Sequence, residues 1–258
     1  MAGQARSLGN LGDSLWYAGR PAQAVEYYEQ GLEVCREIGD RHGEANSLIG
    51  LGNAYYSLGQ YQRVIDCQQQ SLEIHREIGD RNGEAASLGN LGLAYNSLGQ
   101  YQRAIDFQQQ SLEIRREIGD RNGEAASLGN LGLAYNSLGQ YQRAIDFQQQ
   151  SLEIRREIGD RNGEANSLGN LGNASYSLGQ YQRTIDFFQQ SLEICREIGD
   201  LSGEAISYFN LSQALAKTDE KREALQSFEK ARALFEGMEL LHMVEKCNEA
   251  IQALKKIF

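Results

Sequence analysis

The stretch from Gly89 to Tyr101, GNLGLAYNSLGQY, decides the fold, because it recurs unchanged at residues 129–141. Around it, residues 89–128 and 129–168 differ only where Ala126 becomes Asn166, so the chain repeats a unit of 40 residues. A fixed period of this length is typical of solenoids, in which each unit buries its apolar face against its neighbours. The sequence therefore predicts a stack of units whose function resides on a long exposed surface.

Each unit is expected to form two antiparallel helices. Asp80 stands where an N-cap residue would begin a first helix, which ends at Leu98, before Gly99. A second apolar stripe begins at Tyr101 and ends at Gly119, a typical residue just past a helix C-terminus. The short link between the two helices leaves room only for an antiparallel pair. We call the first helix of each unit helix A and the second helix B.

The residues Leu91-Gly92-Leu93-Ala94-Tyr95, Gly99-Gln100-Tyr101 and Ala104 recur between Leu131 and Ala144. This pattern resembles the tetratricopeptide repeat. A glycine inside a helix costs about 1 kcal/mol relative to alanine, so Gly92 is expected at a close contact between helices A and B. The unit is long and ends in Gly-Asp instead of proline, which is similar to Pins/LGN spindle-orientation adaptors and bacterial regulators. Kinesin light chain is a more distant relative.

The resemblance implies an all-α fold, a right-handed α-solenoid of six tetratricopeptide-type hairpins with a C-terminal capping helix. Residues 1–258 are expected to form a single array, with the capping helix at 239–258 and units at 1–39, 40–79, 80–119, 120–159, 160–199 and 200–237.

The end units depart from the pattern, as terminal repeats do. Leu15 and Trp16 stand where Ala-Tyr would continue the first unit, and Ser212 and Asp219 replace two glycines of the sixth. Because Met1 lies about where the first helix A should begin, we expect a fragment of a longer protein. A native start with a frayed first turn is the alternative.

Composition limits the class of protein and of partner. The chain contains 41% hydrophobic and 23% charged residues, which is ordinary for a folded globular protein. Its formal net charge of −10 makes a nucleic-acid partner unexpected, because phosphate binding needs a basic face. Neither a secretory leader nor a membrane-spanning apolar run is recognisable, so the sequence predicts a cytoplasmic protein without a membrane partner.

Catalysis is not expected. The three histidines lie in different units, without a nucleophile or metal ligand at a useful spacing, and are expected at the surface: His42, His75 and His242. The sequence therefore predicts neither an enzyme nor a bound cofactor or metal.

Four reduced cysteines are expected. Cys35 and Cys195 share one repeat position, which is expected to be solvated because other units carry polar residues there: His75, Arg115 and Arg155. Cys67 replaces Phe107 and is expected in the core. The absence of a CxxC spacing disfavours disulfides and zinc.

Helix A carries the surface on which we expect binding. Steps of three and four residues place a row of amides on the side away from Leu91 and Tyr95, and the resemblance implies that this side lines a concave groove. We call it the groove face. A carboxamide both donates and accepts hydrogen bonds, so this row suits the backbone of a bound peptide. Solvation, or bonding between neighbouring helices, is the alternative. The asparagines are Asn10, Asn46, Asn53, Asn82, Asn90, Asn96, Asn122, Asn130, Asn136, Asn162, Asn166, Asn170, Asn173 and Asn210.

The chemistry of the groove face is graded along the chain. Its N-terminal end is aromatic, its middle mildly apolar and its C-terminal end polar. The residues concerned are, in that order, Trp16, Tyr17 and Tyr56; Leu93 and Leu133; and Asn173, Tyr176, Gln213 and Lys217. Aromatic anchors often carry much of a binding energy. Contact of Trp16 and Tyr17 with a preceding helix is an equally open alternative.

An arginine begins helix A in each of the middle units: Arg41, Arg81, Arg121 and Arg161. The resemblance to the spindle adaptors implies that these arginines flank the groove and receive acidic side chains. Solvation, or pairing with the preceding aspartates, is the favoured alternative: Asp40, Asp80, Asp120 and Asp160.

Differences between copies concentrate on the groove face. Residues 49–88 and 89–128 differ at seven positions, and these four lie there: Ile49/Gly89, Gly50/Asn90, Asn53/Leu93 and Tyr56/Asn96. The helix B run Gln108-Gln109-Gln110, expected to be exposed, is retained. Tuning for a ligand therefore explains the differences better than free drift.

Two non-enzymatic functions follow. In the first, the array is a protein–protein interaction scaffold that binds a peptide of another protein, or of its own parent chain, in the asparagine-rich groove. In the second, it self-associates through an uncapped N-terminal end, or regulates other domains of a multidomain signalling protein.

Overall fold

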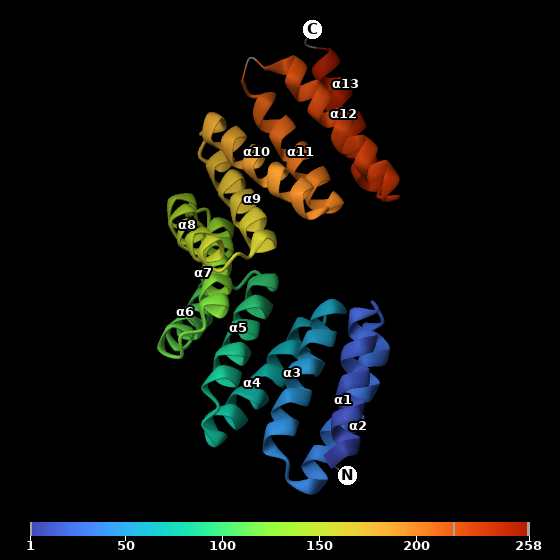
Figure 1. The fold of residues 1–258 in the computed structure, drawn as a ribbon, viewed down its shortest axis with the longest axis vertical. Helices are drawn as coiled ribbons and strands as arrows, with labels where there is room; N and C mark the ends of the chain where they lie inside the picture. Colours follow the sequence, from blue (N-terminus) through green and yellow to red (C-terminus); the bar gives the residue numbers. More distant parts are fainter. Residues whose placement is uncertain (1, 219, 257–258) are drawn as a thin grey trace. The chain divides into compact units, whose positions relative to one another are not determined.

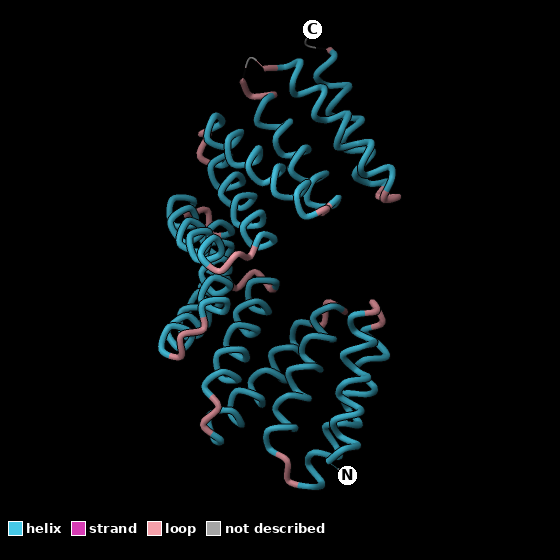
Figure 2. The backbone as a smooth tube through the Cα atoms, viewed as in Figure 1, coloured by secondary structure: helices cyan, strands magenta, loops and turns pink. Residues whose placement is uncertain are grey.

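The computed structural model describes residues 2–218 and 220–256, and every regular element in this part of the chain is an α-helix (Figures 1 and 2). The all-α prediction is confirmed. Met1, Asp219 and residues 257–258 of the expected capping helix lie outside the described residues. The helices are α1 (Ala2–Tyr17), α2 (Pro21–Ile38), α3 (Arg41–Ser57), α4 (Tyr61–Ile78), α5 (Arg81–Ser97), α6 (Tyr101–Glu117), α7 (Arg121–Ser137), α8 (Tyr141–Glu157), α9 (Arg161–Ser177), α10 (Tyr181–Ile198), α11 (Leu201–Leu215), α12 (Lys221–Gly237) and α13 (Leu241–Lys255).

Aspartates begin helices A and glycines follow the helix ends. Asp80 is the N-cap of α5, as predicted, and its Oδ1 accepts the backbone N–H of Gly83 at 3.0 Å. The same bond recurs at Asp40, Asp120, Asp160 and Asp200. Gly99 and Gly119 have φ values of 73° and 69°, in the left-handed region that suits glycine. The repeated glycines and aspartates therefore set where one helix stops and the next starts.

Helix contacts divide the chain into two compact units, residues 1–134 and 135–258. In the first, successive helices from α1 to α6 pack on one another, and α3 also contacts α1 and α5. In the second, successive helices from α8 to α13 pack on one another, and α9 also contacts α11. Neighbouring hairpins therefore meet partly through their A helices.

The core consists of small and aliphatic side chains supported by aromatic rings. In α5, Leu91 and Ala94 are fully buried, and Tyr95 stacks on Phe107 of α6 with ring centroids 5.3 Å apart. At the C-terminal end, Cys247 of α13 is buried in a cluster that includes Phe235 of α12. Helix α13 thus covers the apolar side of α12, as expected of a capping helix.

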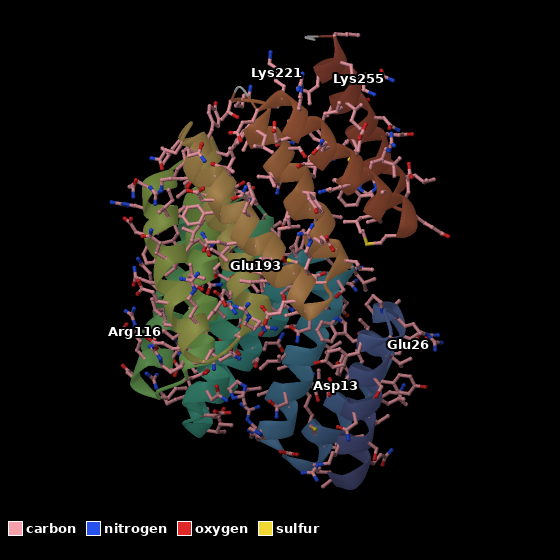
Figure 3. The ribbon with its side chains drawn as sticks, turned by 45° about the horizontal axis from the view of Figure 1, so that its top comes forward. Asp13, Glu26, Arg116, Glu193, Lys221 and Lys255 are labelled. Carbon is pink, nitrogen blue, oxygen red and sulfur yellow. The ribbon has the colours of Figure 1, made fainter. Side chains whose placement is uncertain are left out.

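Polar side chains cover the outward sides of the helices. Glu26, Arg116 and Glu193 are all exposed (Figure 3). Within the described residues, no helix is both long and apolar enough to cross a membrane.

One buried position of helix B varies among the units. It holds Tyr28, Gln68, Gln108, Gln148, Phe188 and Phe228. The expectation that Gln108 is exposed was wrong, because its side chain is 1% exposed and lies against Gly92, as predicted for a glycine at a close contact. A Cβ atom at Gly92 would lie 2.6 Å from Nε2 of Gln108. Packing therefore explains why the second, third and fourth units keep this glutamine. Its retention says nothing about how fast exposed positions change between copies.

A second variable position of helix B, which we call the junction position, holds Cys35, His75, Arg115, Arg155 and Cys195. The prediction that it is solvated was wrong, since Cys35, His75 and Cys195 are each at most 2% exposed. The side chain lies over a glycine of the next helix A, beside its N-cap aspartate. At Gly83, for example, a Cβ atom would lie 2.1 Å from the ring of His75. Of the expected surface histidines, only His42 and His242 are exposed.

Candidate peptide-binding groove

The predicted groove residues all remain accessible, but to two different degrees. The exposed ones are Asn10, Tyr17, Asn46, Tyr56, Asn82, Asn122, Leu133, Asn162, Asn166 and Asn173. The half-buried ones are Trp16, Asn53, Asn90, Leu93, Asn96, Asn130, Asn136, Asn170, Tyr176 and Asn210. Solvent or a ligand can therefore contact every one of these side chains.

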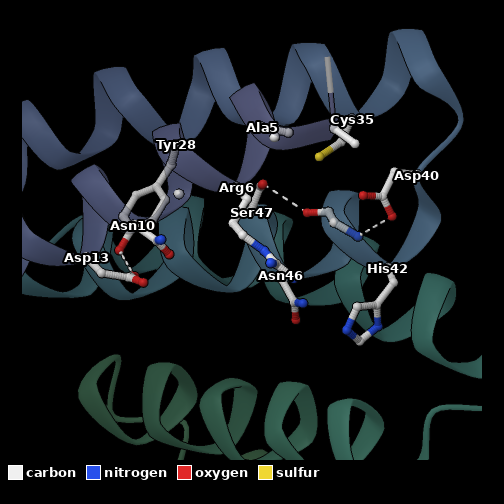
Figure 4. A pocket seen from close by; sticks show the side chains of 14 residues that line it. Ala5, Arg6, Asn10, Asp13, Tyr28, Cys35, Asp40, His42, Asn46 and Ser47 are labelled. Atoms are coloured by element: carbon white, nitrogen blue, oxygen red, sulfur yellow. Dashed lines mark hydrogen bonds between the residues drawn. The ribbon is translucent and has the colours of Figure 1, made fainter.

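Two of them, Asn10 and Asn46, line a cavity of about 700 Å³ between α1 and α3, which we call the N-terminal cavity (Figure 4). Its lining also includes the charged side chains of Arg6, Asp13 and Asp40. In Figure 4 the amide of Asn10 lies beside the ring of Tyr28, whereas Asn46 and His42 lie toward the other end. The cavity therefore offers amides, a cation and carboxylates to one ligand.

Tyr28 shapes the N-terminal cavity. Its ring lies between Gly12 of α1 and Gly50 of α3, at which a Cβ atom would lie 2.7 and 2.5 Å from the ring. Its hydroxyl donates to Oδ1 of Asp13 at 2.6 Å, and burial together with this carboxylate raises the tyrosine pKa well above its usual value. Gly50 is thus required by the packing of Tyr28, so the difference between Gly50 and Asn90 is not evidence for tuning by a ligand.

A second cavity, of only about 10 Å³, brings four predicted groove residues together: Leu93, Asn96, Asn130 and Leu133. Gln108, Gly92 and Ala104 complete its lining, and we call it the amide cavity. The Nε2 atom of Gln108 donates to the carbonyl oxygen of Gly89 at 2.8 Å, which leaves Oε1 as the free acceptor. Oε1 of Gln108 and Oδ1 of Asn96 are both buried without a hydrogen-bond partner among the described residues. Unpaired buried acceptors are costly, so this cavity is suited to a hydrogen-bond donor.

Some of the other amides are already engaged within the protein. Oδ1 of Asn82 accepts from Nη1 of Arg115 at 2.6 Å, and Nδ2 of Asn166 donates to Oδ1 of Asn162 at 3.3 Å. The alternative of bonding within the protein therefore holds for these amides, whereas the amide cavity retains unpaired acceptors.

The aromatic residues of the N-terminal end are tied to the following A helices. Trp16 donates from Nε1 to Oγ of Ser57 at 2.9 Å, and the hydroxyl of Tyr56 lies 2.9 Å from Oγ of Ser97. Tyr17 is 82% exposed and its ring centroid lies 4.9 Å from that of Trp16. These contacts hold Trp16 and Tyr56 in place along the groove face and leave Tyr17 accessible.

The arginines that begin the A helices pair with glutamates three residues further on. Nη1 of Arg81 lies 2.6 Å from Oε2 of Glu84, and Nε of Arg76 lies 2.8 Å from Oε1 of the same carboxylate. Arg81 also pairs with Glu117 of the next helix B. Burial disfavours the charged Glu84, but the hydrogen bonds from both arginines outweigh it and lower its pKa. Arg81 is thus committed to two carboxylates.

Several lining residues were missed from the sequence, notably Arg6, Asp13, Tyr28, His42 and Gln108. The alignment of the units contained a signal for all five. Tyr28 and Gln108 align with Phe188 and Phe228, and aromatic residues in other copies mark that column as buried. Arg6, Asp13 and His42 align with Asn46, Asn53 and Asn82 of the next unit, all of which were predicted groove residues.

The model of one protein family, the tetratricopeptide repeat, matches residues 3–77, 45–117, 83–157 and 163–237. The chain belongs to the tetratricopeptide repeat family. The resemblance expected from the sequence is thereby confirmed. No curated protein matches the chain.

Solved tetratricopeptide-type structures share the fold. BtubC (BKLC) from P. vanneervenii has a TM-score of 0.76 at 17% identity, over 85% of this chain and 92% of that one. A putative kinesin light chain repeat protein of Podosopora anserina has a TM-score of 0.63 at 23% identity, over 78% and 99%. A Rap protein complexed with competence and sporulation factor has a TM-score of 0.72 at 15% identity, over 98% and 75%. At these identities the likeness shows the fold alone.

Proposed function

We propose that the chain is a non-enzymatic scaffold that binds a peptide segment of a partner protein along the groove face. Helical repeats of this family are typical of protein–protein interaction scaffolds. The observation that carries the proposal is the amide cavity, where buried acceptor oxygens of Asn96 and Gln108 lie beside Leu93 and Leu133.

A peptide matches both properties of this cavity. Each peptide residue other than proline has a backbone N–H, which is the kind of donor that Oε1 of Gln108 and Oδ1 of Asn96 lack. The side-chain amide of Gln108 is fixed in this orientation, because a flip would break the hydrogen bond from its Nε2 to the carbonyl oxygen of Gly89. An apolar side chain of the peptide can cover Leu93 and Leu133, of which Leu133 is 38% exposed. Together the two amide oxygens suit the backbone of a peptide, and the two leucines suit one of its apolar side chains.

A solved relative supports the same class of function. The Rap protein of similar fold was crystallised in complex with competence and sporulation factor, so a protein of this fold binds a partner molecule. We extend binding, and no particular ligand, to this chain. The N-terminal cavity, with Arg6 and Asp13, provides a second contact region for the same partner.

The test is capture of partners from a lysate of the source cells by three forms of the chain. One is wild type, and one carries Asn90→Ala, Asn130→Ala and Asn170→Ala. The third, a matched control, carries Gln69→Ala, Gln109→Ala and Gln189→Ala, which remove as many amides from exposed helix B positions. Circular dichroism verifies equal helicity.

The proposal expects a protein that mass spectrometry finds with wild type and with the glutamine control but not with the asparagine variant. Equal capture by all three forms, or capture by none, contradicts binding through the groove face.

A further inference from the structure

We propose that His42, His75 and Asp80 form a binding site for a divalent transition-metal ion, of which Zn²⁺ is the expected occupant. The three side chains come from α3, from α4 and from the N-cap of α5. Nδ1 of His75 lies 3.0 Å from Oδ2 of Asp80, and Nδ1 of His42 lies 3.7 Å from the same oxygen. One ligand atom from each residue lies within 4.8 Å of the others. Two imidazoles and a carboxylate are an established ligand set for zinc.

His75 is the buried ligand of this site. Its side chain is 1% exposed, and neither Nδ1, which faces Asp80, nor Nε2 has a hydrogen-bond partner of good geometry among the described residues. A buried imidazole ordinarily finds a partner for each ring nitrogen. Burial lowers the pKa of His75 despite the nearby Asp80, so the ring is held in the neutral form that binds metals. A buried, neutral and incompletely paired imidazole is suited to a metal ion.

Asp80 can serve the helix and the metal at once. Its Oδ1 accepts the N–H of Gly83 at 3.0 Å and caps α5, whereas Oδ2 faces the two histidines. The hydrogen bond from Gly83 is the largest cause of the lowered pKa of this carboxyl, so the carboxylate is ionised at neutral pH. The cap therefore fixes the orientation of the oxygen that would bind the ion.

In the next unit a cationic side chain occupies this place. There Asn82, Arg115 and Asp120 occupy the positions of His42, His75 and Asp80. Nη1 of Arg115 donates to Oδ1 of Asn82 and to Oδ2 of Asp120, so one guanidinium bridges the other two side chains. The neutral ring of His75 supplies no such positive charge. A metal ion held by both histidines would supply the missing positive charge beside Asp80.

The geometry suits a four-coordinate ion. Bonds of about 2.0–2.2 Å place tetrahedral ligand atoms about 3.3 Å apart, close to the observed 3.0 and 3.7 Å. The His42 side chain is 64% exposed and free to adjust its ring. Three protein ligands leave a fourth position for water or for a donor atom of a ligand. Because His42 also lines the N-terminal cavity, the ion would lie at the edge of that cavity.

The test is calorimetric titration of the full chain, without a polyhistidine tag, with Zn²⁺, together with the visible absorption of bound Co²⁺. The variants are His42→Asn and His75→Arg, which install the residues of the next unit and so preserve the fold. Asp80→Asn keeps an N-cap residue and removes the charge. His242→Asn, at an exposed histidine outside the site, is the matched control.

We expect one Zn²⁺ per wild-type chain, with affinity weakened at least about tenfold by each site variant and unchanged by His242→Asn. The Co²⁺ complex should show tetrahedral absorption bands only when both site histidines are present. Absence of binding by wild type, equal affinity in His42→Asn and His75→Arg, or an equal loss in His242→Asn would overturn the assignment.

Discussion

Gln108 fills the space that Gly92 leaves by lacking a Cβ atom, with the amide nitrogen of Gln108 only 2.6 Å from where that atom would lie. Nε2 of Gln108 is held there by its hydrogen bond to the carbonyl oxygen of Gly89, and the Cγ and Cδ atoms lie 2.8 and 2.9 Å from the same Cβ position. The glycine is thus a requirement of the contact between α5 and α6.

We expect Gly92→Leu to destabilise the protein by about 1–3 kcal/mol, because the new side chain displaces Gln108 from a packed interface. Gly169→Ala is the matched control, since a Cβ atom at that helical glycine meets nothing within 4 Å. It should stabilise α9 by about 0.5–1 kcal/mol. Urea unfolding followed by circular dichroism measures both. A loss of stability in the alanine control, or none in Gly92→Leu, would refute this account of the two glycines.

The second prediction concerns pH. Burial opposes ionisation of Glu44, Glu84, Glu124 and Glu164, but the arginines paired with each outweigh it, and the pKa of each falls below its ordinary value of 4.5. A group with a lowered folded-state pKa stabilises the protein fully above its ordinary pKa and loses that contribution as pH falls through the folded value. The free energy of unfolding should therefore fall as the solution is acidified below pH 4.5, through the lowered folded-state pKa values.

Glu84→Gln combined with Glu124→Gln should flatten this dependence. Because the arginine partners are about half exposed, we expect a loss of only about 1 kcal/mol per site at neutral pH. Glu73→Gln with Glu113→Gln removes the same charge from exposed positions and serves as the control. Urea titrations at several pH values measure the slopes, and an identical slope in both double variants would exclude the buried glutamates as its source.

The repeat itself made the fold predictable. Asp80, Gly99 and Gly119 recur at fixed spacing and mark helix ends by local chemistry, so the order of the helices follows from the sequence. The buried positions of helix B were harder to predict, because polar residues at these positions were expected to be exposed. Gln108 and His75 are polar residues in contact with glycines, and their burial depends on which glycine of a neighbouring helix lies opposite.

The candidate site was predictable only in part, for the same reason. Helical periodicity placed Asn96 and Asn130 on one accessible side, since that needs no knowledge of a partner helix. The contribution of Gln108 to the amide cavity, and the meeting of His42, His75 and Asp80, depend on contacts between hairpins. Residues 33 and 38 positions apart have no spacing rule that reveals such meetings.

The last prediction follows from the replacement of Phe107 by Cys67. In the third repeat the ring of Phe107 lies nearly parallel to that of Tyr95, at an interplanar angle of 2°. In the second repeat Tyr55 has Cys67 at the corresponding place, and both line a cavity of about 610 Å³ together with Leu32, Leu48 and Leu51.

Cys67→Phe should fill part of this cavity and restore the stack, which adds about 0.5–1.5 kcal/mol of stability beyond that of the buried area. The melting temperature should therefore rise by several degrees. Cys67→Leu, which adds apolar volume without a ring, should give a smaller rise, and Phe107→Cys should lower the melting temperature. If Cys67→Phe melts no higher than wild type, or no higher than Cys67→Leu, the parallel stack contributes no stability of its own in this fold.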